Sequence, residues 1–301
     1  MNGTRFTTTH EITAAAAPER LFDLVADVQG APRHAPSQMH AEILRHGPAG
    51  DVIKRWVFAG RGMRAWTFRR AVDRAALRIV FTHIDPAPPV RDQRGTWTFR
   101  ATGDGGALVR VQHLIETVDA ADEVPLRAGF DQQVPAQLAG YKAAGELGAA
   151  LTRRYVTGEE TAVVPGTVAD VRARLLGTGL WAVHHPEATG VTVTDLGEDA
   201  ALLEVAGAAA RYFWLRPNDT DIVYKSLDPP EGLHAQTGRW RTTQLAPDRV
   251  EVVLRHTVTL PLAGGAGPDP RALREPIRAE LRQLLAALGG SPAAATGGGR
   301  T

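Results

Sequence analysis

The sequence predicts an α+β protein made of two similar domains, each a curved antiparallel sheet wrapped around a long C-terminal helix. Two observations lead to this fold class: an internal repeat, and the order of elements within each copy of it. Residues 79–86 (IVFTHIDP) reappear as residues 222–229 (IVYKSLDP), 143 positions later. This period is far longer than the roughly 20–50 residues of solenoid and propeller repeats, so the repeating unit is a whole domain.

Two further landmarks keep the same offset without a gap. The tripeptide GTW at 95–97 becomes GRW at 238–240, and His113 becomes His256. Each copy therefore spans enough chain to bury a core of its own. We expect a first domain at 1–155, a linker at 156–165, a second domain at 166–288 and a disordered, Gly/Ala/Pro-rich tail at 289–301.

The order of elements within the first copy predicts the sheet and its helix. Apolar residues recur at helical spacing over residues 18–28, and a longer pattern over residues 135–154 predicts the closing helix. Between them, turn signals separate expected strands at 39–44, 52–58, 63–72, 76–84, 94–101 and 107–118. The second copy repeats this order, with helices expected at 168–176 and 271–288 and short strands between 191 and 260.

A sheet wrapped around a helix encloses a hollow unless large side chains fill it. Concave and mostly apolar hollows of this kind are where small organic ligands bind. We therefore expect one pocket in each copy. Side chains alternate between the two faces of a strand, so parity identifies the residues that face the hollow.

Parity directs one histidine of each copy into the hollow. His113 shares a strand face with Val109, Val111 and Ile115, and His256 holds the equivalent place in the second copy. Two interpretations stay open: a core histidine bonded to a backbone carbonyl, or an acid/base group at a ligand site.

A second strand places a cation among aromatic rings, since Trp66, Phe68 and Arg70 share one face. A guanidinium is costly to bury unless it is paired or solvated. Arg70 therefore either reaches water at the strand end or is a fixed cation that polarises ketone or enolate oxygens. Trp97 beside Gly95 is likewise either ordinary packing or a platform for a planar ligand.

Composition narrows the function classes. The 301 residues carry a net charge of +1, which is not the pattern of a nucleic-acid binder. No apolar run is long enough to span a membrane and the N-terminus lacks a signal-peptide pattern, so we expect a cytoplasmic location. Cys is absent, and the pairs His184-His185 and His83/Asp85 lack a third ligand at a useful spacing, so we expect neither a metal nor an organic cofactor.

Five segments of the first copy form a recognisable set: 21–28 (LFDLVADV), 35–40 (APSQMH), 66–70 (WTFRR), 95–97 (GTW) and 111–113 (VQH). Together they resemble the polyketide aromatase/cyclases of bacterial type II aromatic polyketide synthases. Those proteins are START/Bet v1-like helix-grip domains, and the tandem arrangement is similar to their di-domain subgroup. The resemblance implies two helix-grip domains in tandem, each with an internal cavity.

The resemblance also implies an activity. An aromatase/cyclase directs a regiospecific aldol cyclisation, here expected between C7 and C12, and the dehydration that aromatises the first ring. The implied substrate is a ketoreduced poly-β-ketone held on an acyl carrier protein. The implied partners are that carrier protein, the minimal polyketide synthase and a ketoreductase, and no metal or organic cofactor is implied.

The resemblance assigns roles to residues of this sequence. Arg70 is implied as the anchor of the polyketide oxygens and His113 as the acid/base group. His34 stands near the place where relatives often carry a tyrosine. The implied substrate-binding residues are Trp66, Phe68, Trp97, His34 and Asp131 in the first domain, and Arg211, Trp240 and His256 in the second.

A second class of protein shares this fold, namely carriers that bind lipids or quinones without chemistry. A carrier pocket is expected to be almost uniformly apolar, so an inward-facing Arg70 and His113 favour an enzyme. In a third interpretation, one copy only scaffolds the other within a synthase complex.

Overall fold

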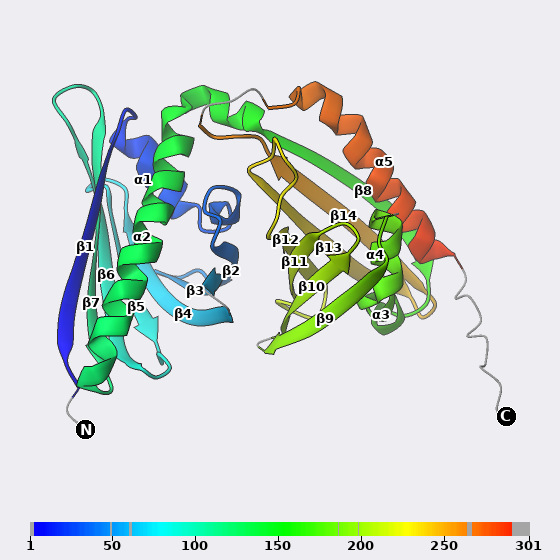
Figure 1. Ribbon diagram of the computed structural model, residues 1–301, viewed down its shortest axis with the longest axis horizontal. Coiled ribbons are helices and arrows are strands. Elements are labelled where there is room, and N and C mark those ends of the chain that lie inside the picture. The colour runs from blue at the N-terminus through cyan, green and yellow to red at the C-terminus, as the bar shows by residue number, and fades with distance from the viewer. Residues whose placement is uncertain are drawn as a thin grey trace.

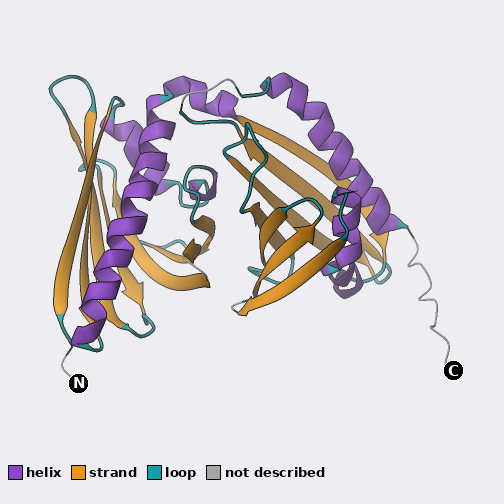
Figure 2. Ribbon diagram, viewed as in Figure 1, coloured by secondary structure: helices purple, strands orange, loops and turns teal. Residues whose placement is uncertain are grey.

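The computed structural model describes residues 3–48, 50–59, 62–185, 187–197, 199–263 and 267–290. The chain folds into two α+β domains, each with a seven-stranded antiparallel sheet and a long helix that lies along it (Figure 1, Figure 2). This arrangement confirms the expected tandem helix-grip fold. None of the described helices is long and apolar enough to cross a membrane.

The first domain contains, in chain order, β1 (Arg5–Ala14), α1 (Pro18–Ala26), a 3₁₀ turn (Ala31–Arg33), β2 (Gln38–Arg45), β3 (Asp51–Ala59), β4 (Gly62–Asp73), β5 (Arg78–Ile84), β6 (Val90–Ala101), β7 (Ala107–Thr117), a second 3₁₀ turn (Ala120–Asp122), α2 (Glu123–Glu146) and a 3₁₀ segment (Gly148–Arg154). The strand order in the sheet is β1-β7-β6-β5-β4-β3-β2. α2 packs along β1 and against α1.

The second domain contains β8 (Tyr155–Pro165), α3 (Val168–Leu176), α4 (Thr178–His184), β9 (Gly190–Gly197), β10 (Ala200–Ala206), β11 (Ala210–Leu215), β12 (Asp221–Ser226), β13 (Ala235–Ala246), β14 (Arg249–Thr259) and α5 (Pro270–Gly289). The strand order is β8-β14-β13-β12-β11-β10-β9. The tail expected at 289–301 lies outside the described residues, apart from Gly289 and Gly290.

The duplicated motif holds the same place in both sheets. Phe81 on β5 lies opposite Gly95 on β6, and Tyr224 on β12 lies opposite Gly238 on β13. A Cβ added at either glycine would overlap the aromatic ring opposite it. Packing therefore explains the repeated glycine, which makes room for a ring of the neighbouring strand.

The first strand of each domain was not among the strands expected from the sequence. Residues 156–165, expected as a linker, form most of β8, which pairs with β14 along its whole length. β1 takes the equivalent edge position in the first sheet and has no counterpart among the expected strands. Both strands alternate a few buried residues with exposed Thr and Glu. Such a pattern resembles a polar loop, because an edge strand of this kind has one solvated face.

The closing helix of the first domain starts earlier than expected. α2 begins at Glu123, so Pro135 lies in its interior, and it ends at Glu146 instead of Arg154. Pro276 likewise lies inside α5. An interior proline removes one backbone hydrogen bond. Packing of the whole helix along β1 outweighs this local cost.

The two domains meet through the outer face of the second sheet. An apolar cluster joins Met39 and Trp56 of the first domain to Ala200, Phe213, Leu215 and Val223 of the second. Beside it, the buried ammonium of Lys225 donates to three backbone carbonyls between Ala35 and Gln38, at 2.8–3.0 Å. The second domain therefore holds the chain segment that leads into β2.

Candidate functional site

One row of facing residues crosses the first sheet and contains both predicted catalytic residues. The register pairs Arg70 with Phe81, and Phe81 with Gly95. Gly95 in turn lies opposite His113. Directly opposed residues share a face of the sheet, so Arg70 and His113 lie on the same, inner side. The ring of Phe81 lies between them and meets the His113 ring edge to face at 5.6 Å.

His113 is buried and neutral. Burial is the main cause that lowers the pKa of His113 to about 3, with smaller effects from the charges of His10 and His83. The ring of Phe130 on α2 lies 4.7 Å away. Within the described residues its hydrogen-bond partner is the hydroxyl of Thr8, 3.4 Å from Nδ1, not a backbone carbonyl. The imidazole therefore keeps a lone pair at neutral pH.

Arg70 is buried, and protein groups already engage its guanidinium. Nε and Nη2 lie 3.2 and 3.1 Å from Oδ2 of Asp51. Nη1 donates to the carbonyl of Ala26, the last residue of α1, at 2.7 Å. These bonds tie α1 to the sheet, and Arg70 does not extend to water at a strand end. Its role as an anchor for substrate oxygens stays a prediction.

The other two residues of the β4 set lie as parity predicts. Phe68 is buried, and the half-buried Trp66 stacks on His83, with ring centroids 5.8 Å apart and planes at 16°. Burial first, and then the charge of Arg55, lower the pKa of His83 to about 4. Trp66, Phe81 and His83 point to the inner side of the sheet yet keep accessible surface. Their exposed surface is therefore turned to the space between the sheet and α2.

A cavity of about 220 Å³ lies between α2 and the chain around β2 and β3. Its lining residues are Pro36, Ser37, Phe58, Gln132, Gln133, Ala136 and Gln137. Gln137 is also hydrogen-bonded to the hydroxyl of Tyr141, which is buried on the inner side of α2. One lining residue of this cavity is thus hydrogen-bonded to a buried residue of the domain.

Asp131, predicted to line the pocket, does not do so. Its side chain is 60% exposed and lies 2.9 Å from Nε2 of His10 on β1. The prediction placed residue 131 in a segment before the helix, whereas α2 already spans it and turns its side chain outward. Trp97 is buried in the core and meets Tyr141 edge to face at 6.1 Å, so it is part of ordinary packing.

His34 lies where the two domains join. Its Nε2 is 2.7 Å from the hydroxyl of Tyr155, the first residue of β8. Its backbone carbonyl is 3.1 Å from Nε2 of His234 in the second domain. Burial is the main cause that lowers the pKa of His34 to about 3. The side chain therefore acts as a neutral hydrogen-bonding group at the junction.

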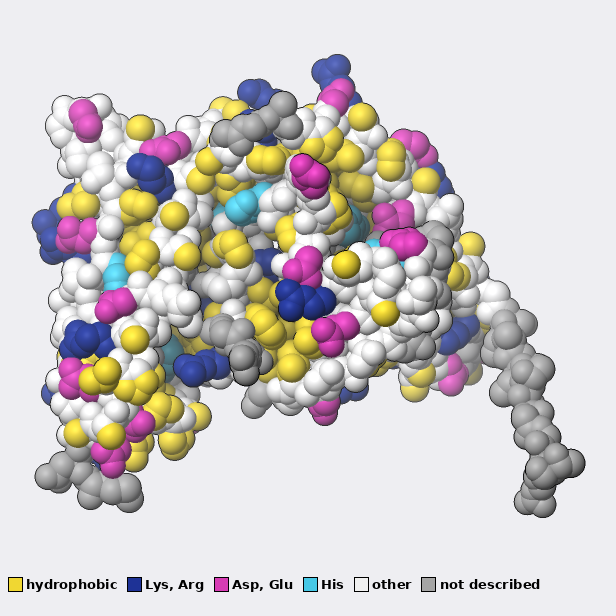
Figure 3. Space-filling model, viewed as in Figure 1, with side chains coloured by type: hydrophobic (Ala, Val, Ile, Leu, Met, Phe, Trp, Pro, Cys, Tyr) yellow, Lys and Arg dark blue, Asp and Glu magenta, His cyan; other side chains and the backbone are white. Residues whose placement is uncertain are grey.

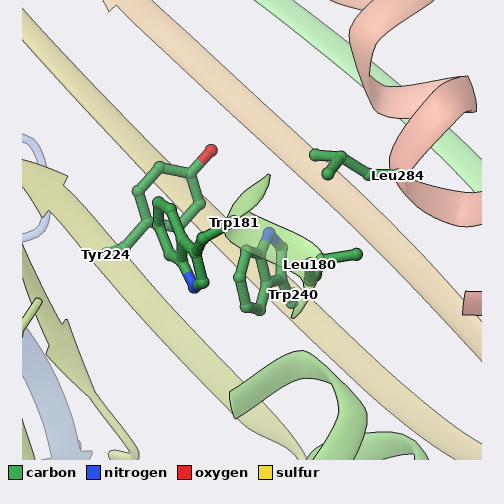
Figure 4. A pocket seen from close by; sticks show the side chains of 5 residues that line it. All are labelled: Leu180, Trp181, Tyr224, Trp240 and Leu284. Atoms are coloured by element: carbon green, nitrogen blue, oxygen red, sulfur yellow. The ribbon is translucent and has the colours of Figure 1, made fainter. Parts of the chain in front are cut away.

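The pocket expected in the second domain is filled by aromatic side chains. Trp181 on α4 packs 4.7 Å from the ring of Tyr212 and 5.9 Å from that of Trp240. The remaining space beside them measures about 10 Å³ and is lined by Leu180, Trp181, Tyr224, Trp240 and Leu284 (Figure 4). Such a volume holds about one water molecule. The space found where the second pocket was expected is therefore too small for an organic ligand.

The predicted pocket residues of the second domain are accounted for in this packing. Nδ1 of His256 lies 2.5 Å from the hydroxyl of Tyr224, a group that Phe81 lacks in the first domain. Arg211 points to the opposite face of β11 from Tyr212, is exposed, and pairs with Asp228 at 2.7 Å. Its prediction as a pocket residue is wrong, because the β11–β12 connection is one residue shorter than the β4–β5 connection, so the offset of 143 does not hold on β11 and Trp214 corresponds to Arg70.

The register identifies what replaces Arg70. Trp214 lies opposite Tyr224 in the second sheet as Arg70 lies opposite Phe81 in the first. Ala201 then corresponds to Asp51, since each faces its respective partner on the next strand. The second domain therefore has neither the cation nor its carboxylate at this level.

Sequence reasoning missed one candidate, Arg55 on β3. It shares a strand face with the buried Ile53 and Val57 and lies opposite Trp66. The same parity argument that selected Arg70 would have found it. Among the residues that the structure describes, no three His, Asp or Glu side chains come together as metal ligands.

Comparisons with known proteins agree with this geometry. Residues 5–152 match the family described as polyketide cyclase/dehydrase and lipid transport. The chain is 29% identical to the actinorhodin polyketide synthase bifunctional cyclase/dehydratase of Streptomyces coelicolor, over 93% of this chain and 96% of that protein. It is 24% identical to the granaticin polyketide synthase bifunctional cyclase/dehydratase of Streptomyces violaceoruber, over 92% and 88% of the two chains.

Solved structures share the arrangement of both domains. The di-domain ARO/CYC StfQ from the steffimycin biosynthetic pathway superposes with a TM-score of 0.77 at 24% identity, covering 94% of this chain and 97% of that one. The di-domain ARO/CYC BexL from the BE-7585A biosynthetic pathway gives a TM-score of 0.76 at 24% identity, with 94% and 96% covered. These likenesses establish the di-domain fold, and the sequence matches show that the chain is similar to polyketide cyclase/dehydratases, with the family match confined to the first domain.

Proposed function

We propose that this chain is a polyketide cyclase/dehydratase of a type II polyketide synthase and that its reaction takes place in the hollow of the first domain. One observation carries the proposal: the same fold occurs twice, and among the described residues the first copy places Arg70 and His113 in one row across the inner face of its sheet, whereas the second copy has Trp214 in the place of Arg70. The names of the relatives support the reaction class.

The substrate that we propose is a poly-β-ketone bound to an acyl carrier protein and already reduced by a ketoreductase. Closure between C7 and C12 is the proposed regiochemistry. Both follow from the family resemblance of the sequence. Basic and acidic side chains are mixed on the face shown in Figure 3, and neither sign dominates it. We therefore expect the carrier protein to dock on a small part of the surface.

In the proposed mechanism His113 takes a proton from a methylene between two ketones. The electron pair of that C–H bond moves toward the neighbouring oxygen, and the resulting enolate carbon attacks a ketone carbon further along the chain. The new alkoxide takes up a proton, and the hydroxyl then leaves as water when the ring becomes aromatic. A positioned base contributes about 100- to 10,000-fold in such a step.

The low pKa of His113 makes a cation necessary for this mechanism. An imidazole with a pKa of about 3 is a weak base, so the enolate must be stabilised for proton transfer to be favourable. A guanidinium in the water-poor hollow can provide that stabilisation. Arg70 is the candidate that the sequence identifies.

Reconstitution tests the proposal. A minimal synthase with a ketoreductase and this protein is expected to form one directed first ring, whereas H113A and R70A shift products toward spontaneously cyclised compounds by at least tenfold. R70K keeps the Asp51 pair and separates loss of folding from loss of chemistry. R69A removes an exposed arginine of the same strand and serves as the matched control. Unchanged first-ring patterns in both H113A and R70A would remove their assigned roles.

The alternative function is that of a carrier for hydrophobic ligands. A carrier would bind the product and leave the first-ring pattern the same with and without the protein. The side chains of Arg55, His83 and His113 speak against it, because burying groups of this kind in an apolar carrier pocket costs free energy without a purpose in binding.

A further inference from the structure

Arg55 lies on the inner side of the first sheet, and its surroundings differ from those of Arg70. The register places it opposite Trp66, two pairs along from the Ile53–Phe68 pair. Its guanidinium carbon lies 5.1 Å from the centroid of the Phe68 ring. The guanidinium thus lies over the ring of Phe68, on the inner side of the sheet.

No protein group neutralises this cation in the part of the chain that the structure describes. Arg55 forms no hydrogen bond or ion pair there, and its Nε is buried without a partner. Burial lowers the pKa of Arg55, although part of the side chain keeps accessible surface. A side chain at the wall of an internal hollow is expected to be poorly hydrated and yet to keep some accessible surface, as Arg55 does. Arg70, by contrast, is engaged by Asp51 and Ala26.

The groups around Arg55 are neutral and polar or aromatic. His83 is kept uncharged by burial and by the charge of Arg55 itself. Tyr141, whose pKa burial raises, is also close enough to interact electrostatically with Arg55. A fixed cation beside uncharged hydrogen-bonding groups and the flat ring of Trp66 fits an anionic oxygen on a planar, conjugated ligand.

The second domain shows that the fold does not require this arginine. Val205 lies opposite Ala210 in the second sheet, as Arg55 lies opposite Trp66 in the first. Val205 is 2% exposed and belongs to the hydrophobic core. Ser226 takes the position of His83, since it faces Tyr212 as His83 faces Phe68. In the second domain an apolar side chain, that of Val205, thus occupies the position of Arg55.

We propose that Arg55 binds an ionised oxygen of the substrate, on the part of the poly-β-ketone that lies over Trp66 and Phe68. The inference rests on the proposed function and names a second, uncompensated cation for the same site. Arg70 then holds α1 and the wall of the hollow in place.

A phenol that ionises in the visible range tests this assignment without the synthase. Bound 1,8-dihydroxyanthraquinone is expected to have its first pKa lowered by about 1–3 units in the wild-type protein, the usual effect of an opposite charge in contact. Absorbance titration should show that R55M loses this shift, that R55K retains much of it, and that R70M retains it because Asp51 already neutralises Arg70. R69M is the matched control on the exposed face.

Three results would each overturn the assignment: no binding of the dye to the wild type, a bound dye whose pKa is unshifted, and a shift in R55M equal to that in the wild type. Reconstitution separates this failure from that of the proposed function. If the wild type directs the first ring and R55M does so equally well, only the role of Arg55 is wrong. If the wild type itself leaves the first-ring pattern unchanged, the proposed function fails.

Discussion

Gly95 is the residue that allows Phe81 to lie between Arg70 and His113. A methyl group at this position would overlap the Phe81 ring and approach the carbonyl of Gln112 to 2.8 Å. We expect G95A to lower the free energy of unfolding by about 1–3 kcal/mol, the usual cost of overpacking. Urea unfolding measures this change.

The matched control for that substitution is G103A. Gly103 lies in the turn between β6 and β7, where an added Cβ meets no atom within 4 Å. Its effect should stay within about 0.5 kcal/mol, as for most surface changes. Equal stabilities of G95A and G103A would show that the Phe81 ring moves aside at no cost.

Single side chains were predictable from the sequence where strand parity alone decides. Parity places Arg70 and His113 on the inner face, and the structure agrees. It cannot identify partners, because the carboxylate of Asp51 reaches Arg70 only through the pairing of β3 with β4. Arg55 was open to the same argument. The sequence could not show, however, that Arg55 lacks a counter-ion, because this depends on which residues the neighbouring elements place beside it.

At the level of elements, α4 decides that the second hollow is closed. Its Trp181 packs among four aromatic side chains, those of Tyr212, Trp214, Tyr224 and Trp240. In the first domain a 3₁₀ turn at Ala31–Arg33 follows the first helix instead. The side chain of Trp181 on this short helix therefore fills space between the sheet and α5 of the second domain.

Removing this side chain should reopen the second hollow. We expect W181A to lower the free energy of unfolding by about 3–5 kcal/mol, the range for a buried Trp replaced by Ala, and to increase the fluorescence of 1-anilinonaphthalene-8-sulfonate. The directed cyclisation should persist, because the proposed site lies in the other domain. V183A removes an exposed side chain of the same helix and should change neither quantity. A W181A protein as stable as the wild type would contradict the filled-core description.

Elements were predictable where periodicity is strong and were missed where it is weak. α3 was expected at 168–176 and is found there. The edge strands β1 and β8 carry too few apolar residues to be distinguished from polar segments. α4 has seven residues, too short for a helical period to stand out, and its role depends on the aromatic residues of strands far away in the sequence.

Across the whole molecule, duplication has produced two domains with one fold and different interiors. The repeat in the sequence predicted the two domains, but it could not show which copy remains hollow. That difference arises from residues that do not repeat, such as Trp214 in place of Arg70 and Val205 in place of Arg55. The outer face of the second sheet meanwhile supports the first domain through Lys225. We infer that the second copy serves chiefly to hold the first.

The histidines of the first domain should appear in the response to acid. His34, His83 and His113 have their pKa lowered to about 3, 4 and 3, respectively, mainly by burial. In the unfolded chain a histidine titrates near pH 6.5. Between these values the unfolded state binds more protons than the folded one, so the free energy of unfolding falls as the pH is lowered through this window.

Urea unfolding at pH 7, 6 and 5 measures the effect before carboxylates titrate appreciably, since their usual pKa values lie near 4. We expect stability to fall steadily over this range and H83Q to show a shallower decline, because one of the buried imidazoles is removed. H46Q replaces a histidine whose side chain is 75% exposed but pairs with Asp51 at 2.8 Å, so a change in its curve reports that pair and not a buried imidazole. Equal stability of the wild type at pH 7 and pH 5 would mean that these imidazoles accept protons without leaving the fold, and the neutral His113 on which the proposed proton transfer depends would then be in error.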